Sequence, residues 1–214
     1  MAPKLYGDVL SPCVRAVLLT AKALNIALEF IPINLVGGEH LSTKYLKINP
    51  QHTVPTLDDD GVIIWDSHAI MIYLAEKYGK DTSIYPTDVA KRAKIHRLLF
   101  FECGELFSMH RYLCGELFSK KKISEDIATE EVKALQFLEA FLTNSKYVAG
   151  DELTIADFSI WATLSNSLNL VPIEETKFPR ITEWMEFMNQ NPYKEINEPG
   201  AATFKKLING VLRK

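Results

Sequence analysis

The chain lacks the residues and runs that would mark a metal framework or a membrane protein. Its 214 residues include only three cysteines, Cys13, Cys103 and Cys114, and no two of them have CxxC spacing. We therefore expect neither a disulfide framework nor a bound metal. The apolar N-terminal stretch is short and broken by charges, so we expect a cytoplasmic protein with no membrane partner.

The chain also has no large excess of basic or of acidic residues. The 24 Lys and Arg residues balance 27 Asp and Glu for a formal net charge of −3, and no basic block exceeds Lys120–Lys122. Nucleic acid is not expected as a partner, because it requires a basic surface. What the chain does have is 47% hydrophobic residues, enough to bury the core of one domain or of two small ones.

The first third of the chain alternates strand and helix patterns. We expect strands at Leu5–Tyr6, Leu28–Ile33, Thr56–Leu57 and Val62–Trp65, and helices at Val14–Leu24, Leu41–Leu46 and Ser67–Tyr78. The last two strands flank a turn, and Gly79 stops the last helix. The order β-α-β-α-β-β-α predicts a small sheet with helices on its faces.

Beyond a polar linker the strand signals end. Apolar residues recur at helical spacing in Ala90–Phe118, Val132–Leu142, Ile155–Leu170, Ile181–Met188 and Phe204–Leu212, so the second part is all helical. Thr154 and Asp157 fit a capping box with a structural role. The predicted organisation is an α/β domain at 1–80, a linker at 81–88 and an all-helical domain at 89–214.

Two features in the first third of the chain indicate a ligand site. The proline of Val54-Pro55 cannot donate to a central ladder, so it belongs at a strand start, where a cis bond would turn backbone groups toward a ligand. Asp66 and Ser67 directly precede an apolar-periodic run, where the free amides of a helix N-terminus bind anions. Together they predict a site for a charged, peptide-like molecule.

These features resemble those of the cytosolic glutathione transferases over essentially the whole chain. The resemblance is carried by Ser11–Arg15, Asn49–Leu57, Asp66–Ile70 and Leu153–Asp157, and finer features are similar to the insect delta and epsilon classes, epsilon being the closer. It implies a thioredoxin-like N-terminal domain, a C-terminal helical bundle, glutathione as cosubstrate and a homodimer formed through the third and fourth helices. The implied reaction is conjugation of glutathione to small hydrophobic electrophiles, in a detoxification-type role.

The resemblance assigns activation of glutathione to Ser11. Glutathione reacts as a thiolate, and its free pKa lies about two units above neutral, so the protein must stabilise the sulfur anion. Ser11 could instead be a helix N-cap without chemistry, and Tyr6 is the rival donor because other classes use an N-terminal tyrosine. Omega-class and glutaredoxin-like relatives place a reactive cysteine where Ser11 stands, so we expect Cys13 to be a small buried hydrophobe. We expect the same of Cys103 and Cys114, which lie within the long helical stretch.

The same resemblance implies how glutathione is held. Asp66 would pair with its γ-glutamyl ammonium, and Ser67 would receive the adjacent carboxylate. Backbone groups at Val54-Pro55 would pair with the cysteinyl part, and His40 and His52 match positions near the glycyl carboxylate. Most relatives have Glu where this chain has Asp66, which is one methylene shorter.

An apolar acceptor site is expected at the domain interface. One helical face carries Phe107, Arg111, Cys114 and Phe118. Such a stripe is also typical of plain core, but in epsilon relatives this face binds the electrophile, with Leu35 as an aliphatic wall from the other domain. Arg111 would stabilise charge on the electrophile or pair with an acidic residue across the domains.

Two alternatives keep the fold and change the function. The first is a dedicated transferase for an endogenous, steroid-related substrate, as in the Noppera-bo branch of insect transferases, with Glu105 and His110 as polar partners for a sterol hydroxyl. The second is a non-enzymatic ligand carrier, against which Ser11, Asp66 and Ser67 count.

Overall fold

Four short strands form one mixed sheet in the N-terminal part of the chain. In the computed structural model, which describes residues 2–80 and 83–212, they are β1 (Lys4–Gly7), β2 (Glu29–Pro32), β3 (Thr56–Asp59) and β4 (Val62–Trp65). Their order is β2-β1-β3-β4, with β1 parallel to β2 and antiparallel to β3. Thr56 pairs with both Tyr6 and Trp65, so the end of β1, the start of β3 and the end of β4 meet at one edge.

The helices of this part confirm the predicted element order. They are α1 (Pro12–Ala23), α2 (Thr43–Leu46), which follows the 3₁₀ turn η1 (Glu39–Leu41), and α3 (Ser67–Tyr78). Helix α1 begins two residues earlier than predicted, because Pro12 suits the first helical turn, where no amide donor is needed. Helices α1 and α3 lie side by side and carry the apolar core of the sheet.

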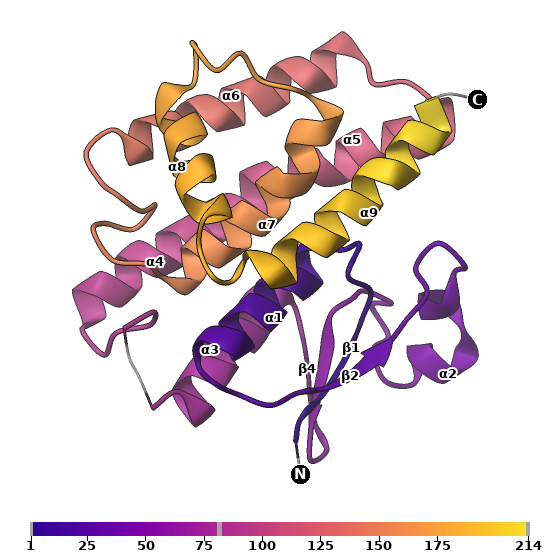
Figure 1. The fold of residues 1–214 in the computed structure, drawn as a ribbon. Helices are drawn as coiled ribbons and strands as arrows, with labels where there is room; N and C mark the ends of the chain where they lie inside the picture. The colour runs from indigo at the N-terminus through magenta and orange to yellow at the C-terminus, as the bar shows by residue number, and fades with distance from the viewer. Residues whose placement is uncertain (1, 81–82, 213–214) are drawn as a thin grey trace.

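The rest of the chain is helical, as predicted, and forms a second layer above the sheet unit (Figure 1). The helices are α4 (Val89–Phe101), α5 (Phe107–Lys120), α6 (Glu125–Leu142), α7 (Ile155–Leu170), α8 (Pro179–Asn189) and α9 (Lys194–Leu212). Helix α7 packs on α1, and one continuous core cluster runs through both units. Within the described ranges, every helix is too short or too polar to cross a membrane.

The structure corrects three predicted helix ranges in the second unit. The predicted helix 90–118 is interrupted by a π-helical turn, η2 (Glu102–Leu106), which changes the direction in which the α5 side chains point relative to those of α4. Helix α6 begins seven residues before its predicted start. The prediction missed these residues because the first turns of the helix are acidic and carry no apolar periodicity.

Helix α9 starts ten residues before the predicted Phe204. Pro199 and Gly200 are poor helix formers, yet both lie inside α9. Gly200 is required by a close approach, since a Cβ there would lie 2.3 Å from the Val9 carbonyl oxygen and 2.7 Å from Cδ of Arg15. Tertiary packing against the loop before α1 therefore fixes this part of α9.

The structural role of Asp157 is confirmed. Its carboxylate accepts hydrogen bonds from the Thr154 amide at 2.8 Å, the Thr154 hydroxyl at 2.9 Å and the Val148 amide at 2.9 Å. The carboxylate is fully buried and forms the capping box of α7. Asp157 therefore fixes the helix on which the sheet unit rests.

The connection between the two units is packed rather than free over its described part. Ile84 and Tyr85 are buried, and the Ile155 amide donates to the Ile84 carbonyl at 3.1 Å. Residues 81–82 of the predicted linker lie outside the described residues. The domain limits at 80 and 89 stay a prediction.

Candidate active site

Arg15 ties the loop that ends at Ser11 to the helical unit. Its guanidinium is fully buried at the first turns of α1. It donates five hydrogen bonds, to Val9 O at 2.8 Å, Leu10 O at 3.1 Å, Ala162 O at 3.0 Å, Asn166 Oδ1 at 2.8 Å and Asn197 Oδ1 at 2.8 Å. Because these acceptors belong to the loop, α7 and α9, one side chain fixes all three relative to α1.

Ser11 occupies the N-cap of α1, but its side chain does not cap the helix. Its backbone is extended, its amide donates to the Asp8 carbonyl at 2.9 Å, and its hydroxyl makes no capping hydrogen bond. The residue is partly exposed. The hydroxyl is thus placed beside the helix N-terminus and is available to a ligand.

Cys13 is partly exposed, so the expectation that it is buried was wrong for the residue as a whole, although its sulfur is buried. Its thiol interacts with the hydroxyls of Ser11 and Ser67, which places it between the starts of α1 and α3. Burial of the sulfur, followed by the nearby charge of Glu102, raises the pKa of the Cys13 thiol far above neutral. A group that stays a thiol is a poor redox nucleophile.

The backbone at Val54-Pro55 has the predicted form. The bond is cis, and Pro55 is buried directly before β3. In the segment before it, His52 is exposed, and its ring centroid lies 6.5 Å from that of His40. His40 is half-buried, and its Nδ1 is buried without a hydrogen-bond partner. The structure thus brings the two predicted histidines together.

Asp66 is held at the N-cap of α3 with one carboxylate oxygen. Oδ1 accepts from the amides of His68 at 2.9 Å and Ala69 at 3.3 Å and lies 3.4 Å from Nδ1 of His68. Hydrogen bonding to His68 lowers the pKa of Asp66, against the effect of partial burial. All described protein contacts of this carboxylate end on Oδ1, so Oδ2 can accept from a ligand. Ser67, the next residue, is buried.

Sequence reasoning missed Glu102, which connects Asp66 to the helical unit. Its carboxylate is almost fully buried, and Oε2 lies 2.8 Å from Nε2 of His68. Oε1 accepts from the Thr163 hydroxyl, and Ser159 Oγ lies 3.0 Å from the same His68 nitrogen. The one sequence feature that could have indicated Glu102 is its position as an acidic residue directly after the apolar run Leu98–Phe101.

Cys103 completes a small group with Asp66 and His68. One donor atom of each lies within 4.8 Å of the others, the only such group of three or more His, Cys, Asp or Glu residues in 2–80 and 83–212. Asp66 and Cys103 are exposed at its edge, so the expectation that Cys103 is buried was also wrong. Asp66 and His68 already have protein partners.

The charge state of His68 is a testable consequence of this network. Burial alone would lower the pKa of His68, but hydrogen bonds to Asp66, Cys103 and Glu102 outweigh it and raise the pKa to about 11. Its contribution to stability is present below pH 6.5 and lost as the pH rises toward 11. An NMR titration should show no His68 protonation step between pH 6 and 8. In the Glu102→Gln variant the step should move toward neutral pH, and an unmoved step would contradict the assignment.

A cavity of about 520 Å³ opens beside Ser11 at the interface of the two units. All six predicted acceptor-site residues line it, namely Leu35, Phe107, His110, Arg111, Cys114 and Phe118. The wall also contains residues that sequence reasoning missed, namely Leu10, Pro12, Val36, Phe204 and Leu207. Of these, Phe204 and Leu207 come from α9. Apolar periodicity predicted a helix there but could not show that the helix packs beside this cavity. Tyr6 and Glu105 are absent from the wall.

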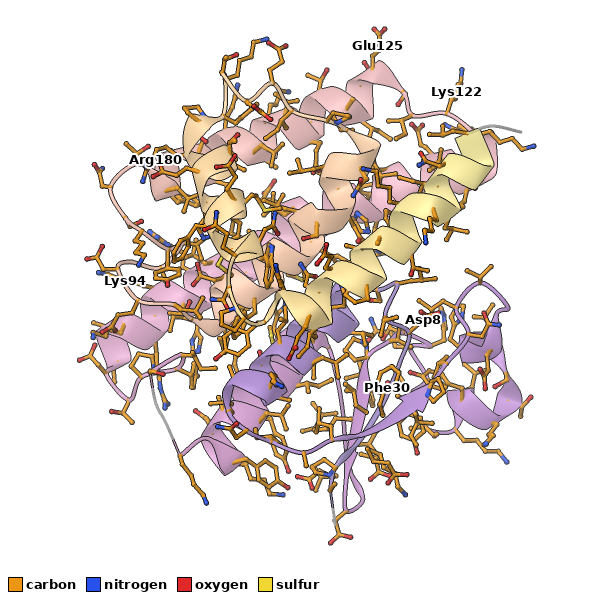
Figure 2. All side chains as sticks on the ribbon, in the orientation of Figure 1. Asp8, Phe30, Lys94, Lys122, Glu125 and Arg180 are labelled. Atoms are coloured by element: carbon orange, nitrogen blue, oxygen red, sulfur yellow. The ribbon has the colours of Figure 1, made fainter. Side chains whose placement is uncertain are left out.

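Asp8 fixes the sheet side of this cavity. Its Oδ1 accepts from the Leu10 amide at 3.0 Å, and its Oδ2 accepts from the Leu35 amide at 3.1 Å. Figure 2 shows Asp8 where the sheet unit meets the helices of the second unit. The two loops that face the cavity from the sheet unit are therefore held together by one carboxylate.

Arg111 is exposed and lines the cavity. No ion pair in the described part of the chain involves it. Within the described residues Arg111 therefore has no acidic partner across the domains, and its charge is available to a ligand.

His110 is a nearly buried polar residue of the cavity wall. The residue is 4% exposed, and its ring stacks on Phe107 and packs against Phe204, with centroid distances of 6.0 Å and 5.6 Å. Its Nδ1 lies 3.2 Å from Ser167 Oγ, and its Nε2 lies 3.6 Å from Cys114 Sγ. Burial, followed by the charge of Arg15, lowers the pKa of His110 to about 3, so the imidazole is neutral.

Glu131 makes folding stability depend on pH. It is fully buried on α6, and neither carboxyl oxygen has a hydrogen bond of normal geometry. Burial, offset in part by the Ser167 hydroxyl, raises its pKa from 4.5 to about 7. Because the folded state holds this proton more tightly than the unfolded state, stability is lost as the pH rises from 4.5 through 7.

We therefore expect Glu131→Gln to stabilise the protein at pH 8 by roughly 2–4 kcal/mol, with the difference vanishing near pH 5. Urea unfolding of both proteins at the two pH values measures this. A stability difference that is the same at pH 5 and at pH 8 would contradict the assignment, because the expected change between the two pH values comes only from the ionisation of Glu131.

The fold and the site define a protein with a sheet unit and a helical unit that share one pocket at their interface. The family models for the N-terminal and C-terminal domains of glutathione S-transferases match residues 5–82 and 106–192. The chain belongs to the glutathione S-transferase family.

Its similarity to insect members of this family extends over nearly its whole length. It is 41% identical to glutathione S-transferase 1 of Manduca sexta, covering 97% of this chain and 98% of that protein. An epsilon-class enzyme from the housefly, Musca domestica, is 46% identical, covers 98% of both chains and superposes with a TM-score of 0.93. A glutathione transferase homolog from Drosophila mojavensis with bound glutathione is 41% identical, covers 97% of this chain and 96% of its own, and has a TM-score of 0.94.

Proposed function

We propose that the protein conjugates reduced glutathione to small hydrophobic electrophiles and that Ser11 stabilises the glutathione thiolate. The observation that carries the proposal is the Ser11 hydroxyl, which stands at the N-terminus of α1, makes no capping bond and faces an apolar cavity. A sulfur anion in this place is stabilised by the hydroxyl and by the partial positive charge of the helix end.

Glutathione would lie along the sheet edge where β1, β3 and β4 meet. The backbone at Val54-Pro55 would pair with its cysteinyl part, as an added antiparallel strand. Oδ2 of Asp66 would accept from the γ-glutamyl ammonium, Ser67 would donate to the adjacent carboxylate, and His40 and His52 would approach the glycyl carboxylate. The similar Drosophila mojavensis structure contains bound glutathione, which supports glutathione as the ligand of this chain.

The electrophile would occupy the 520 Å³ cavity beside the thiolate. Its binding residues are Leu35, Phe107, His110, Arg111, Cys114 and Phe118, with Arg111 stabilising negative charge that develops on the electrophile. We propose a detoxification-type role in the cytoplasm, a homodimer formed through α3 and α4, and domain limits at 1–80 and 89–214.

Glutathione-agarose retention combined with activity toward chlorodinitrobenzene tests the proposal. Retention with clear conjugation supports it. Retention with little conjugation but tight steroid binding would favour the dedicated steroid-related transferase, for which His110 in the cavity wall would be a polar partner. Failure of retention would point to a ligand carrier on the same fold and would overturn the proposal.

A further inference from the structure

Three side chains that can bind a metal ion gather at the start of α3. Asp66 is the N-cap of α3, His68 lies in its first turn and Cys103 lies in η2, and one donor atom of each lies within 4.8 Å of the others. None of the three lines the apolar cavity. Asp66 and Cys103 are exposed, so an ion can reach the group from solvent.

His68 is oriented in the way that a metal-bound histidine is. Its Nε2 lies 2.8 Å from Oε2 of the buried Glu102 and 3.0 Å from Ser159 Oγ, whereas its Nδ1 lies 3.4 Å from Oδ1 of Asp66. A ligating imidazole usually donates its other N–H to a carboxylate, which fixes the ring and makes the ligating nitrogen more basic. Nε2 is held by the interior of the helical unit, so Nδ1 is the nitrogen that can bind an ion.

The spacing of the group suits a tetrahedral ion. With zinc–ligand distances of about 2.0–2.3 Å, neighbouring donor atoms of such an ion lie about 3.3–3.8 Å apart. The 3.4 Å between Asp66 Oδ1 and His68 Nδ1 is in this range. The Cys103 sulfur, within 4.8 Å of the other donors, has to approach by about 1.5 Å at most. Rotation about the Cα–Cβ bond of this exposed side chain supplies such a movement.

The donor set selects the kind of cation. A thiolate, an imidazole and a carboxylate are ligands of Zn²⁺ and of the thiophilic Cd²⁺, whereas Mg²⁺ and Ca²⁺ prefer oxygen ligands alone. On binding, the Cys103 thiol and Nδ1 of His68 each release one proton to water, and the Nε2–H stays on Glu102. The cation has to displace the Nδ1 proton, so it binds reversibly rather than as a permanent structural ion.

We propose that Asp66, His68 and Cys103 form a binding site for a thiophilic divalent cation, Zn²⁺ or Cd²⁺, and that the bound cation excludes glutathione. The cation is an inhibitor and not a cofactor of the reaction. The exclusion of glutathione rests on the proposed function, in which the Asp66 carboxylate receives the γ-glutamyl ammonium. A cation on that carboxylate takes the place of the ammonium, so the two ligands compete.

Titration with Cd²⁺ in the absence of glutathione tests the site through the ultraviolet absorption of the cadmium–thiolate bond. The wild-type protein should bind one ion per chain, and excess Mg²⁺ should not remove the absorption band. Cys103→Ala should abolish the band and weaken Cd²⁺ binding, measured by calorimetry, at least about tenfold.

Cys114→Ala is the matched control for Cys103→Ala. Cys114 also lies beside a histidine, with its Sγ 3.6 Å from Nε2 of His110, but it belongs to no group of three metal-binding side chains in the described residues. The variant should keep the band and the Cd²⁺ affinity. Loss of the band in Cys114→Ala would overturn the proposal, because the ion would then lie in the apolar cavity.

His68→Gln separates the site of three residues from a lone thiol. It leaves Cys103 in place and should weaken Cd²⁺ binding at least about tenfold. Unchanged Cd²⁺ affinity in His68→Gln or in Cys103→Ala would overturn the proposal.

The competition is measured with S-methylglutathione, whose blocked sulfur does not bind the ion as a thiolate. At a Cd²⁺ concentration about ten times its Kd, the Kd of S-methylglutathione should rise about tenfold, and an unchanged value would overturn the exclusion of glutathione. Failure of the proposed function is distinguishable, because the protein would then bind Cd²⁺ as expected and yet not be retained on glutathione-agarose.

Discussion

Replacing Ser11 with alanine is expected to lower kcat/KM for conjugation about 100-fold. The hydroxyl is free of a capping bond and faces the cavity, so its removal takes a hydrogen bond from the thiolate and leaves the helix fold intact. The pKa of bound glutathione should rise by about one to two units toward its free value. Ultraviolet absorbance of the bound thiolate against pH measures that pKa, and retention on glutathione-agarose should change little.

Ser42→Ala is the matched control for Ser11→Ala. Ser42 is also an N-cap serine, but its side chain does cap α2, accepting from the Tyr45 amide at 3.2 Å. Its loss should cost about 1 kcal/mol of stability and leave the thiolate pKa in place. If Ser11→Ala kept full activity and Tyr6→Phe abolished it, the activating role would belong to Tyr6.

Replacing Arg15 with alanine is expected to lower the free energy of unfolding by about 3–5 kcal/mol. The variant would remove five hydrogen bonds, three of them buried, to the loop before α1, to α7 and to α9. A cavity would also form where the fully buried side chain stood. Urea unfolding followed by circular dichroism measures the loss, and a value under about 1 kcal/mol would show that these bonds contribute little.

Lys22 provides the control on the same helix. Its ammonium lies 3.1 Å from Glu195 of α9, and both side chains are more than half exposed. Lys22→Ala removes a cation that also bridges α1 and α9, but an exposed pair contributes only about 0–1 kcal/mol. A loss confined to Arg15→Ala would therefore assign the effect to burial and hydrogen bonding rather than to charge.

Sequence patterns predicted the parts of the site that depend on local chemistry. The cis bond before Pro55, the N-cap positions of Ser11 and Asp66 and the capping box at Asp157 follow from backbone rules that act within a few residues. Helical spacing likewise placed Phe107 and Phe118 on one face, and both line the cavity. The family resemblance supplied the roles that these rules do not contain.

The sequence by itself determined the element order, the all-helical second part and the local geometry at the ends of helices and strands. Only the tertiary structure decided that Glu102 reaches His68, that Glu131 lies against Ser167 and that Phe204 closes the cavity. It also decided that Gly200 lies inside α9. The physical reason is range, because propensity and periodicity act over a few residues, whereas these contacts join segments far apart in the chain. Their burial makes each polar group dependent on a partner that no local pattern names.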